Sequence, residues 1–206
     1  MIRPLALLLA LATRAALVTG AAPALATQDG WPALHDVAGV AADDALNVRA
    51  FPSASAGIVG TLRPDATGVE VVRPTDDLGW GLVNVGEGTG WVSLAFLDRQ
   101  PGQWFGAPPA LASCFGTEPF WTLTFAGDDL TLSTPEREVP GRVLSRPAPS
   151  GDRRRHGLVM AFEGLRVASV RYEPCDDGMS DRAYGLGIDV IADADLLSGC
   201  CTLQSR

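Results

Sequence analysis

Leu46-Asn47-Val48-Arg49 is the stretch that decides the fold of this chain, together with Gly90-Trp91-Val92 and Phe96-Leu97 further along. The first segment alternates apolar and polar side chains, which is typical of a half-buried β-strand. Similar short segments recur between turns that are rich in Gly, Pro and Asp. They lie at residues 58–62, 69–72, 80–85 and 89–92. This density of short strands predicts a small β-barrel over residues 35–98.

Residues 35–98 resemble the bacterial SH3 domain, often called SH3b. The resemblance rests on Leu46-Asn47-Val48-Arg49, Pro52-Ser53, Ile58-Val59-Gly60-Thr61-Leu62, Trp80 with Val83, and Gly90-Trp91-Val92 with Phe96-Leu97. It implies a module that binds peptidoglycan or its peptides, or one that contacts and targets proteins. The family usually follows the arginine with Ser-Gly-Pro, whereas this chain has Ala50-Phe51-Pro52.

The candidate ligand-binding residues of this module are Arg49, Phe51, Trp80 and Trp91. Tryptophan in so small a barrel either fills the core or lines a groove and stacks on a ligand. We expect Trp91 to lie in the core, and we leave both alternatives open for Trp80.

The N-terminus predicts export. Met1-Ile2-Arg3 is a short basic start, Leu5 to Ala12 is an unbroken apolar run, and Ala24-Leu25-Ala26 is a small-residue cleavage site. This order is typical of a secretory signal peptide, which we assign to residues 1–26. No Cys directly follows the cleavage site, so there is no lipobox. No later segment is long and apolar enough to span a bilayer, and we expect a periplasmic or secreted protein.

Charge and composition narrow the range of partners. The formal net charge is -8, which argues against binding to nucleic acid or to anionic membranes. The 23 Gly and 15 Pro residues favour short strands joined by turns. We predict no cofactor and no metal, because the Cys and His spacings do not match a zinc site.

The four cysteines are Cys114, Cys175, Cys200 and Cys201. An even number in an exported chain predicts disulfides. Cys200 and Cys201 are neighbours that point to opposite faces of a strand, so they do not bridge each other. Two pairings remain, and we favour Cys175–Cys200 with Cys114–Cys201.

The second half of the chain is also predicted to be all-β. Residues 100–111 form a linker rich in Pro and Gly, whose Trp104-Phe105 should dock on a domain. Residues 112–203 form the second domain. Its expected strands lie near 121–125, 130–133, 142–144, 158–162, 165–172, 186–191 and 196–200. We expect an antiparallel barrel or curled sheet stapled by disulfides, with residues 147–156 as a polar excursion.

This domain resembles a family of exported bacterial proteins of unassigned function. The resemblance rests on Gly116-Thr117-Glu118-Pro119-Phe120-Trp121, on the segment from Cys175 to Tyr184, and on Ser198-Gly199-Cys200. It implies that Cys175 and Cys200 are a shared pair. The candidate site residues of this motif set are Glu118, Trp121, Asp176, Asp177, Asp181, Arg182 and Tyr184.

The acidic residues of that set have two interpretations. They could form an acid–base pair or a calcium site, but Asp176-Asp177-Gly178-Met179-Ser180-Asp181 lacks the alternating spacing of a calcium loop. We favour a turn in which Asp and Ser side chains cap backbone N–H groups, with Glu118 pairing with Arg182 across the barrel mouth.

The sequence therefore favours a non-catalytic binding protein of the cell envelope, whose partner is peptidoglycan or an envelope protein. A lysozyme-inhibitor-like interaction protein is the alternative. A cell-wall hydrolase is the third hypothesis, and it would need a thiol close to His156. We place His35 at the edge of the first module and His156 in a loop.

Overall fold

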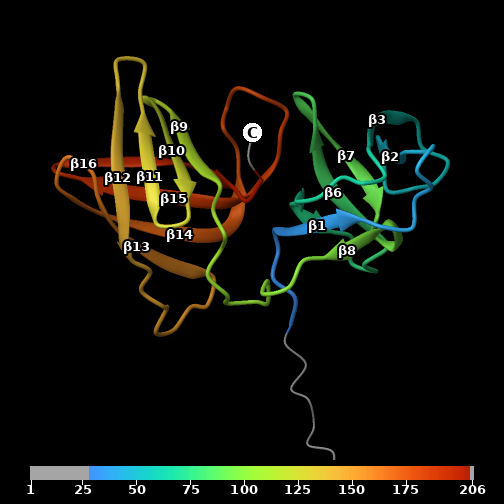
Figure 1. The fold of residues 1–206 in the computed structure, drawn as a ribbon, viewed down its shortest axis with the longest axis horizontal. Coiled ribbons are helices and arrows are strands. Elements are labelled where there is room, and N and C mark those ends of the chain that lie inside the picture. Colours follow the sequence, from blue (N-terminus) through green and yellow to red (C-terminus); the bar gives the residue numbers. More distant parts are fainter. Residues whose placement is uncertain (1–27, 205–206) are drawn as a thin grey trace, which may run out of the picture.

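The computed structural model describes residues 28–204, so the predicted signal peptide lies outside the described residues. The molecule is all-β, as predicted, and consists of two β-structures joined by a linker that runs along one side (Figure 1). Within residues 28–204, no helix is long and apolar enough to cross a membrane.

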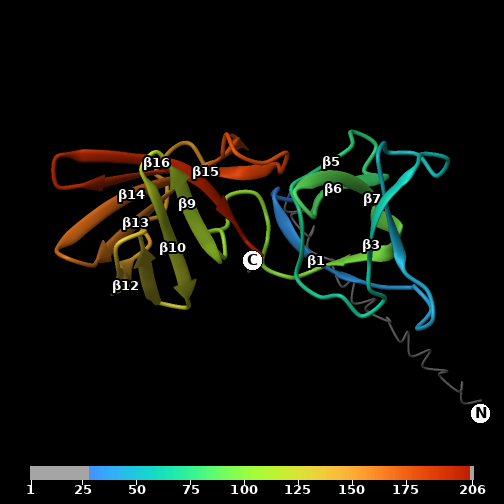
Figure 2. The same cartoon turned by 90° about the horizontal axis from the view of Figure 1, so that it is seen from above.

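The first module has two antiparallel sheets packed face to face (Figure 2). The smaller sheet has the order β4-β1-β8 and the larger one β3-β2-β7-β6-β5. Their bounds are β1 Ala33–Val37, β2 Leu46–Arg49, β3 Ile58–Leu62, β4 Val69–Val71, β5 Arg73–Pro74, β6 Trp80–Val85, β7 Gly88–Ser93 and β8 Leu97–Arg99, with a 3-10 turn at Leu94–Phe96.

Aliphatic side chains fill the space between these two sheets. Val48, Val83 and Val92 come from the larger sheet, and Val71 and Leu97 from the smaller one. All five are buried. A core of valines and leucines leaves the other face of the larger sheet free to carry different side chains.

The second domain is a closed eight-stranded antiparallel barrel. Its strand order is β10-β11-β12-β13-β14-β15-β16-β9, which leaves no free edge. The bounds are β9 Ser113–Thr117, β10 Phe120–Ala126, β11 Asp129–Ser133, β12 Glu138–Ser145, β13 Arg155–Ala161, β14 Leu165–Cys175, β15 Tyr184–Ala192 and β16 Asp195–Thr202.

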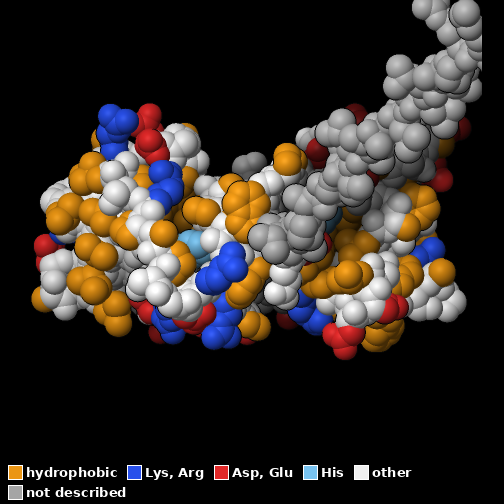
Figure 3. Space-filling view, turned by 90° about the horizontal axis from the view of Figure 1, so that it is seen from below, with side chains coloured by type: hydrophobic (Ala, Val, Ile, Leu, Met, Phe, Trp, Pro, Cys, Tyr) orange, Lys and Arg blue, Asp and Glu red, His pale blue; other side chains and the backbone are white. Residues whose placement is uncertain are grey.

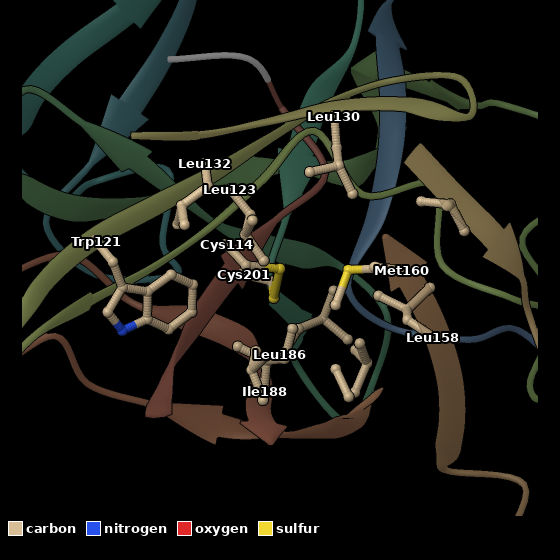
Figure 4. Close-up of a cluster of buried hydrophobic side chains, with 14 of the residues drawn as sticks. Cys114, Trp121, Leu123, Leu130, Leu132, Leu158, Met160, Leu186, Ile188 and Cys201 are labelled. Carbon is tan, nitrogen blue, oxygen red and sulfur yellow. A yellow bond between two sulfur atoms is a disulfide. The ribbon is translucent and has the colours of Figure 1, made fainter. Parts of the chain in front are cut away.

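Both predicted disulfides are present. Cys201 and Cys114 are directly opposite each other on β16 and β9, and their bridge lies inside the barrel core (Figure 4). Cys200 faces the other way and pairs with Cys175 in a smaller cluster with Phe115. The alternation of side chains along β16 thus separates the two neighbouring cysteines. Two disulfides fit a protein that works outside the cytoplasm.

The predicted loop position of His156 is wrong, and His35, which we place at the edge of the first module, is buried. His35 lies on β1, the central strand of the smaller sheet, where it is buried and stacks on Trp31 at 5.4 Å between ring centroids. β13 begins at Arg155, so the predicted polar excursion ends earlier than expected. His156 is therefore a buried strand residue and not a loop residue.

The two β-structures are also joined through a buried carboxylate. Glu70 on β4 is only 4% exposed, and its Oε2 accepts hydrogen bonds from the Leu203 amide at 3.0 Å, the Gln204 amide at 3.4 Å and the Thr202 hydroxyl. These donors lie at and just beyond the end of the last barrel strand. The first module thus holds the end of the barrel through one side chain.

Candidate functional site

One row of side chains crosses the outer face of the larger sheet. Arg73 is opposite Leu82, Leu82 is opposite Trp91, and Trp91 is opposite Arg49. Residues opposite each other on paired strands share a face. The guanidinium of Arg73 lies over the Trp91 ring at 5.0 Å from its centroid. An exposed arginine stacked on a half-buried tryptophan is a surface suited to planar and anionic groups.

Three of the four predicted residues of the first module share this face. Trp80 lies two positions before Leu82 on β6, so it is a diagonal neighbour of Trp91. The expectation that Trp91 fills the core is wrong, because Val92 takes the core position and turns Trp91 outward. Trp80 is likewise half-buried and outside the core cluster.

Arg49 and Phe51 belong to the loop end of β2. The Arg49 guanidinium donates to the Ala56 carbonyl at 2.7 Å and so braces the loop that follows the strand. Phe51 lies in that loop and is 70% exposed. The Arg49 guanidinium is thus bound to the backbone. The guanidinium that stacks on Trp91 belongs to Arg73, which is not among the residues predicted from the sequence. The one feature of the sequence that points to Arg73 is its position directly after Val71-Val72.

The segment from Asp176 to Ala183 forms a capped loop, as expected for its Asp and Ser residues. Asp177 accepts hydrogen bonds from the Met179 amide at 3.0 Å, the Ser180 amide at 2.9 Å and the Tyr184 hydroxyl at 3.2 Å. Partial burial raises the pKa of Asp177, but these bonds together hold it below its usual range. The carboxylate is therefore ionised and serves to order the loop.

This loop stands beside the tip of the β6–β7 hairpin (Figure 1). Asn84 exchanges two hydrogen bonds of 2.9 Å with the Ala183 backbone. The Arg182 guanidinium donates to the Gly86 carbonyl at 2.9 Å, and the Asp181 amide donates to the Glu87 carbonyl at 3.0 Å. The expected pair between Glu118 and Arg182 is wrong, since Arg182 reaches the first module instead.

A cleft of about 400 Å³ lies between the two β-structures at this seam. Arg73 and Trp31 are on one wall, and the barrel contributes the other wall. Its charged lining side chains are Arg73, Glu173, Asp176 and Arg182. The Glu173 carboxylate is paired with Arg171 at 2.7 Å, and the Arg182 guanidinium is bound to the Gly86 carbonyl. Arg73 and Asp176 are therefore the charged groups that the cleft offers to a ligand.

A second groove of about 770 Å³ opens on the other side of the same loop. Trp121 lies at its base and is 4% exposed, with an indole nitrogen that faces away from the leucine core (Figure 4). That nitrogen has no hydrogen-bond partner within residues 28–204. Phe120 and Met179 are exposed at the rim, 53% and 68%.

The remaining candidate residues do not converge on one reacting point. Asp177, Arg182, Tyr184 and Trp121 line the second groove, while Glu118 lies with Asp176 and Asp177 in a smaller hollow nearby. Asp181 is exposed and lines neither. All four cysteines are in disulfides, so none offers a thiol nucleophile. Over residues 28–204, no group of three metal-ligating side chains occurs.

Comparison with known proteins supports the predicted resemblance of the first module. A family model described as the bacterial SH3 domain matches residues 44–98. The match covers β2 to β8, and β1 completes the same module by pairing with β4 and β8. Comparison with curated proteins and with solved structures gave no match.

Proposed function

We propose that this chain is an exported, non-catalytic binding protein of the bacterial cell envelope, in which the SH3 module and the barrel together hold a peptide of peptidoglycan or of an envelope protein. The observation that carries the proposal is the Arg73–Trp91 stack beside the interdomain cleft. An SH3 domain of the bacterial type is consistent with a binding role.

The charges of the cleft indicate the class of ligand. Arg73 would attract a carboxylate, and Asp176 would attract an amine. A peptide carries both kinds of group, whereas a uniformly anionic polymer would be repelled by the carboxylates and by the net charge of -8. Peptide segments of the cell wall fit this mixed lining.

The geometry supports binding rather than turnover. The carboxylate of Asp177 is used to order its own loop, and Asp181 points to solvent at the seam. A glycoside-cleaving pair would need one carboxylic acid with a raised pKa facing a second carboxylate. The pKa of Asp177 is held below its usual range, which is the opposite of what such an acid requires.

Co-sedimentation with purified peptidoglycan sacculi tests this proposal. We expect the full mature chain to pellet with sacculi and the Arg73→Ala variant to bind roughly tenfold more weakly. Arg63→Ala is the matched control, because Arg63 is an exposed arginine of the same module that pairs with neighbouring Asp65. A wild-type chain that stays in the supernatant would remove the wall-binding proposal, and equal losses in both variants would remove the role of Arg73.

The exposed rim of the second groove favours an interaction protein as a second candidate. Phe120 and Met179 present apolar surface beside the Trp121 groove, which suits a protein partner. A lysozyme-inhibitor-like role predicts that the chain lowers lysozyme activity on mixing and that Phe120→Ser weakens the effect. Unchanged lysozyme activity would eliminate this alternative.

A further inference from the structure

The outer face of the barrel carries a row of aliphatic side chains that crosses four neighbouring strands. Val159 on β13 is directly opposite Val167 on β14. Val167 is opposite Ile191 on β15, which is in turn opposite Leu196 on β16. Residues that are opposite each other on paired strands share a face. The solvated face of an antiparallel sheet is usually polar, so this row departs from the ordinary pattern.

Two leucines extend this row. Leu165 is two positions before Val167 on β14, so both side chains lie on the same face. Leu144 is at the bulge of β12, directly before Ser145, which is opposite Val159. We call the six side chains the aliphatic patch: Leu144, Val159, Leu165, Val167, Ile191 and Leu196. Five of them are 46–65% exposed, and Val159 is half-buried.

The aliphatic patch has a polar boundary. Figure 3 views the molecule from below and shows hydrophobic side chains gathered on the barrel. Two positions along β14, β15 and β16, the next outward row consists of Ser169, Asp189 and Ser198. The outward positions of β10 and β11 are also largely polar and include Thr122, Thr124, Thr131 and Ser133. An apolar centre with a polar rim is the usual anatomy of a protein interface.

Charged side chains beside the aliphatic patch are held in ion pairs. The Arg166 guanidinium, between Leu165 and Val167 in sequence, binds the Asp193 carboxylate at 3.0 Å. The Arg171 guanidinium binds the Asp189 carboxylate in the polar row. A partner that covers the patch therefore meets ion pairs rather than single charges at these positions, which avoids the large cost of burying a lone charge.

The aliphatic patch has the size that one side of a stable interface needs. Its exposed side chains amount to roughly 500 Å² of apolar surface, which is in the range of the largest patch on a typical monomer. A standard interface covers about 800 Å² of each partner, and about 60% of that area is apolar. The patch alone therefore supplies the apolar share of such an interface, and the polar rows around it supply the rest.

The composition and the position of the patch favour a second copy of this chain as the partner. The centres of homodimer interfaces are more apolar than transient interfaces, and this patch is aliphatic throughout. Surfaces that bind membranes usually combine aromatic with basic side chains, and the net charge of -8 opposes anionic lipids. The β13–β14 and β15–β16 hairpins extend away from the SH3 module (Figure 2), so a second copy on the patch leaves the interdomain cleft open.

We propose that two copies of this chain pack their aliphatic patches against each other and form a two-fold symmetric dimer with the SH3 modules at its outer ends. In a two-fold dimer the same surface of each copy faces the other, so each patch covers its counterpart. The dimer presents two interdomain clefts, and simultaneous contact of both with one polymer raises the overall affinity. The dimer itself does not depend on what the cleft binds.

Sedimentation velocity of the full mature chain between about 1 and about 100 μM tests the dimer. We expect a species of twice the monomer mass to dominate at the upper concentration. Ile191→Asp places a charge in the patch, where burial without a partner is costly, and should weaken the dimer at least roughly tenfold. Leu78→Asp is the matched control, because Leu78 is 57% exposed in the SH3 module and Ile191 is 56% exposed. Far-UV circular dichroism verifies that both variants are folded.

A second measurement locates the interface without a variant. At high relative to low protein concentration, the methyl resonances of Leu165, Val167 and Ile191 should be shielded from a soluble paramagnetic probe, whereas those of Leu78 should not change. A wild-type chain that stays monomeric up to about 100 μM would overturn the proposal. So would a dimer that Ile191→Asp leaves intact, or one that Ile191→Asp and Leu78→Asp weaken equally. Flotation of a monomeric chain with phosphatidylcholine vesicles would assign the patch to a membrane instead.

Discussion

Trp121 is seated at its end of the barrel by glycines that leave room for its ring. A Cβ added at Gly116 would lie 2.4 Å from Trp121 Nε1 and 2.7 Å from the Ser198 carbonyl oxygen. One added at Gly199 would lie 3.0 Å from Trp121 Cζ2 and 2.0 Å from the Phe115 carbonyl oxygen. Gly116 and Gly199 belong to two motifs far apart in sequence, and the structure shows that both serve the same indole.

Gly116→Ala should therefore lower the free energy of unfolding by about 1–3 kcal/mol, the usual cost of overpacking. Gly57→Ala is the control, because no atom lies within 4 Å of a Cβ placed there. Urea denaturation followed by tryptophan fluorescence measures both. Similar midpoints for the two variants would contradict this account of the Trp121 seat.

Glu70 gives a second prediction for a single side chain. Burial raises the pKa of Glu70 above its usual value, although hydrogen bonds from Thr202, Leu203 and Gln204 lower it in part. The folded state thus holds the proton more tightly than the unfolded state, so this contribution to stability is complete below about pH 4.5 and is lost as the pH rises through the folded pKa.

Glu70→Gln cannot ionise and escapes that loss. Its free energy of unfolding relative to the wild type should rise between pH 4 and pH 7, as measured by urea denaturation at each pH. Glu136→Gln, at an exposed carboxylate, controls for the removal of one charge. If the free energy of unfolding of Glu70→Gln relative to the wild type stays constant or falls over this range, Glu70 is not the group that lowers stability as the pH rises.

Among the elements, β16 determines how the barrel is cross-linked. It places Cys201 inside the barrel and Cys200 outside, so it takes part in both disulfides. The Cys114–Cys201 bridge closes a loop of 87 residues, and the Cys175–Cys200 bridge closes one of 25. Disulfides stabilise mainly by restricting the unfolded chain, and longer loops gain more.

Replacing Cys114 and Cys201 by Ala should cost about 2–4 kcal/mol of unfolding free energy, and somewhat more than replacing Cys175 and Cys200. Besides closing the longer loop, the first bridge lies in the barrel core. Chemical denaturation of the two double variants measures the difference. A larger loss from the shorter loop would contradict this ranking.

Alternation along the strands made much of the fold predictable from sequence. It identified β2 and β10, and it separated the neighbouring cysteines, whereas β3 and β6 were predicted from the turn residues that bound them. It failed for β9, whose residues from Ser113 to Gly116 are all buried, because the barrel core covers one face and the Phe115 cluster covers the other. It also failed for His156, because Arg153-Arg154-Arg155 hid the start of β13.

The candidate site was less predictable because it depends on contacts between the two halves. The sequence identified Arg182 and Asp177 as a motif, but not Asn84 or Gly86, which receive that loop on the first module. Arg73 gains its meaning only from the register that sets it beside Trp91. The contacts of Asn84 and Gly86 with that loop join residues 99 and 96 positions apart, and local patterns carry no information about them.

For the whole molecule, the central claim is that the seam between the SH3 module and the barrel binds cell-wall peptide. Calorimetric titration of the full mature chain with soluble muropeptides tests it most directly. The account predicts saturable binding that is roughly tenfold weaker in Arg73→Ala and unchanged in Arg63→Ala. No saturable heat with the wild-type chain, or equal affinity in wild type and Arg73→Ala, would contradict it.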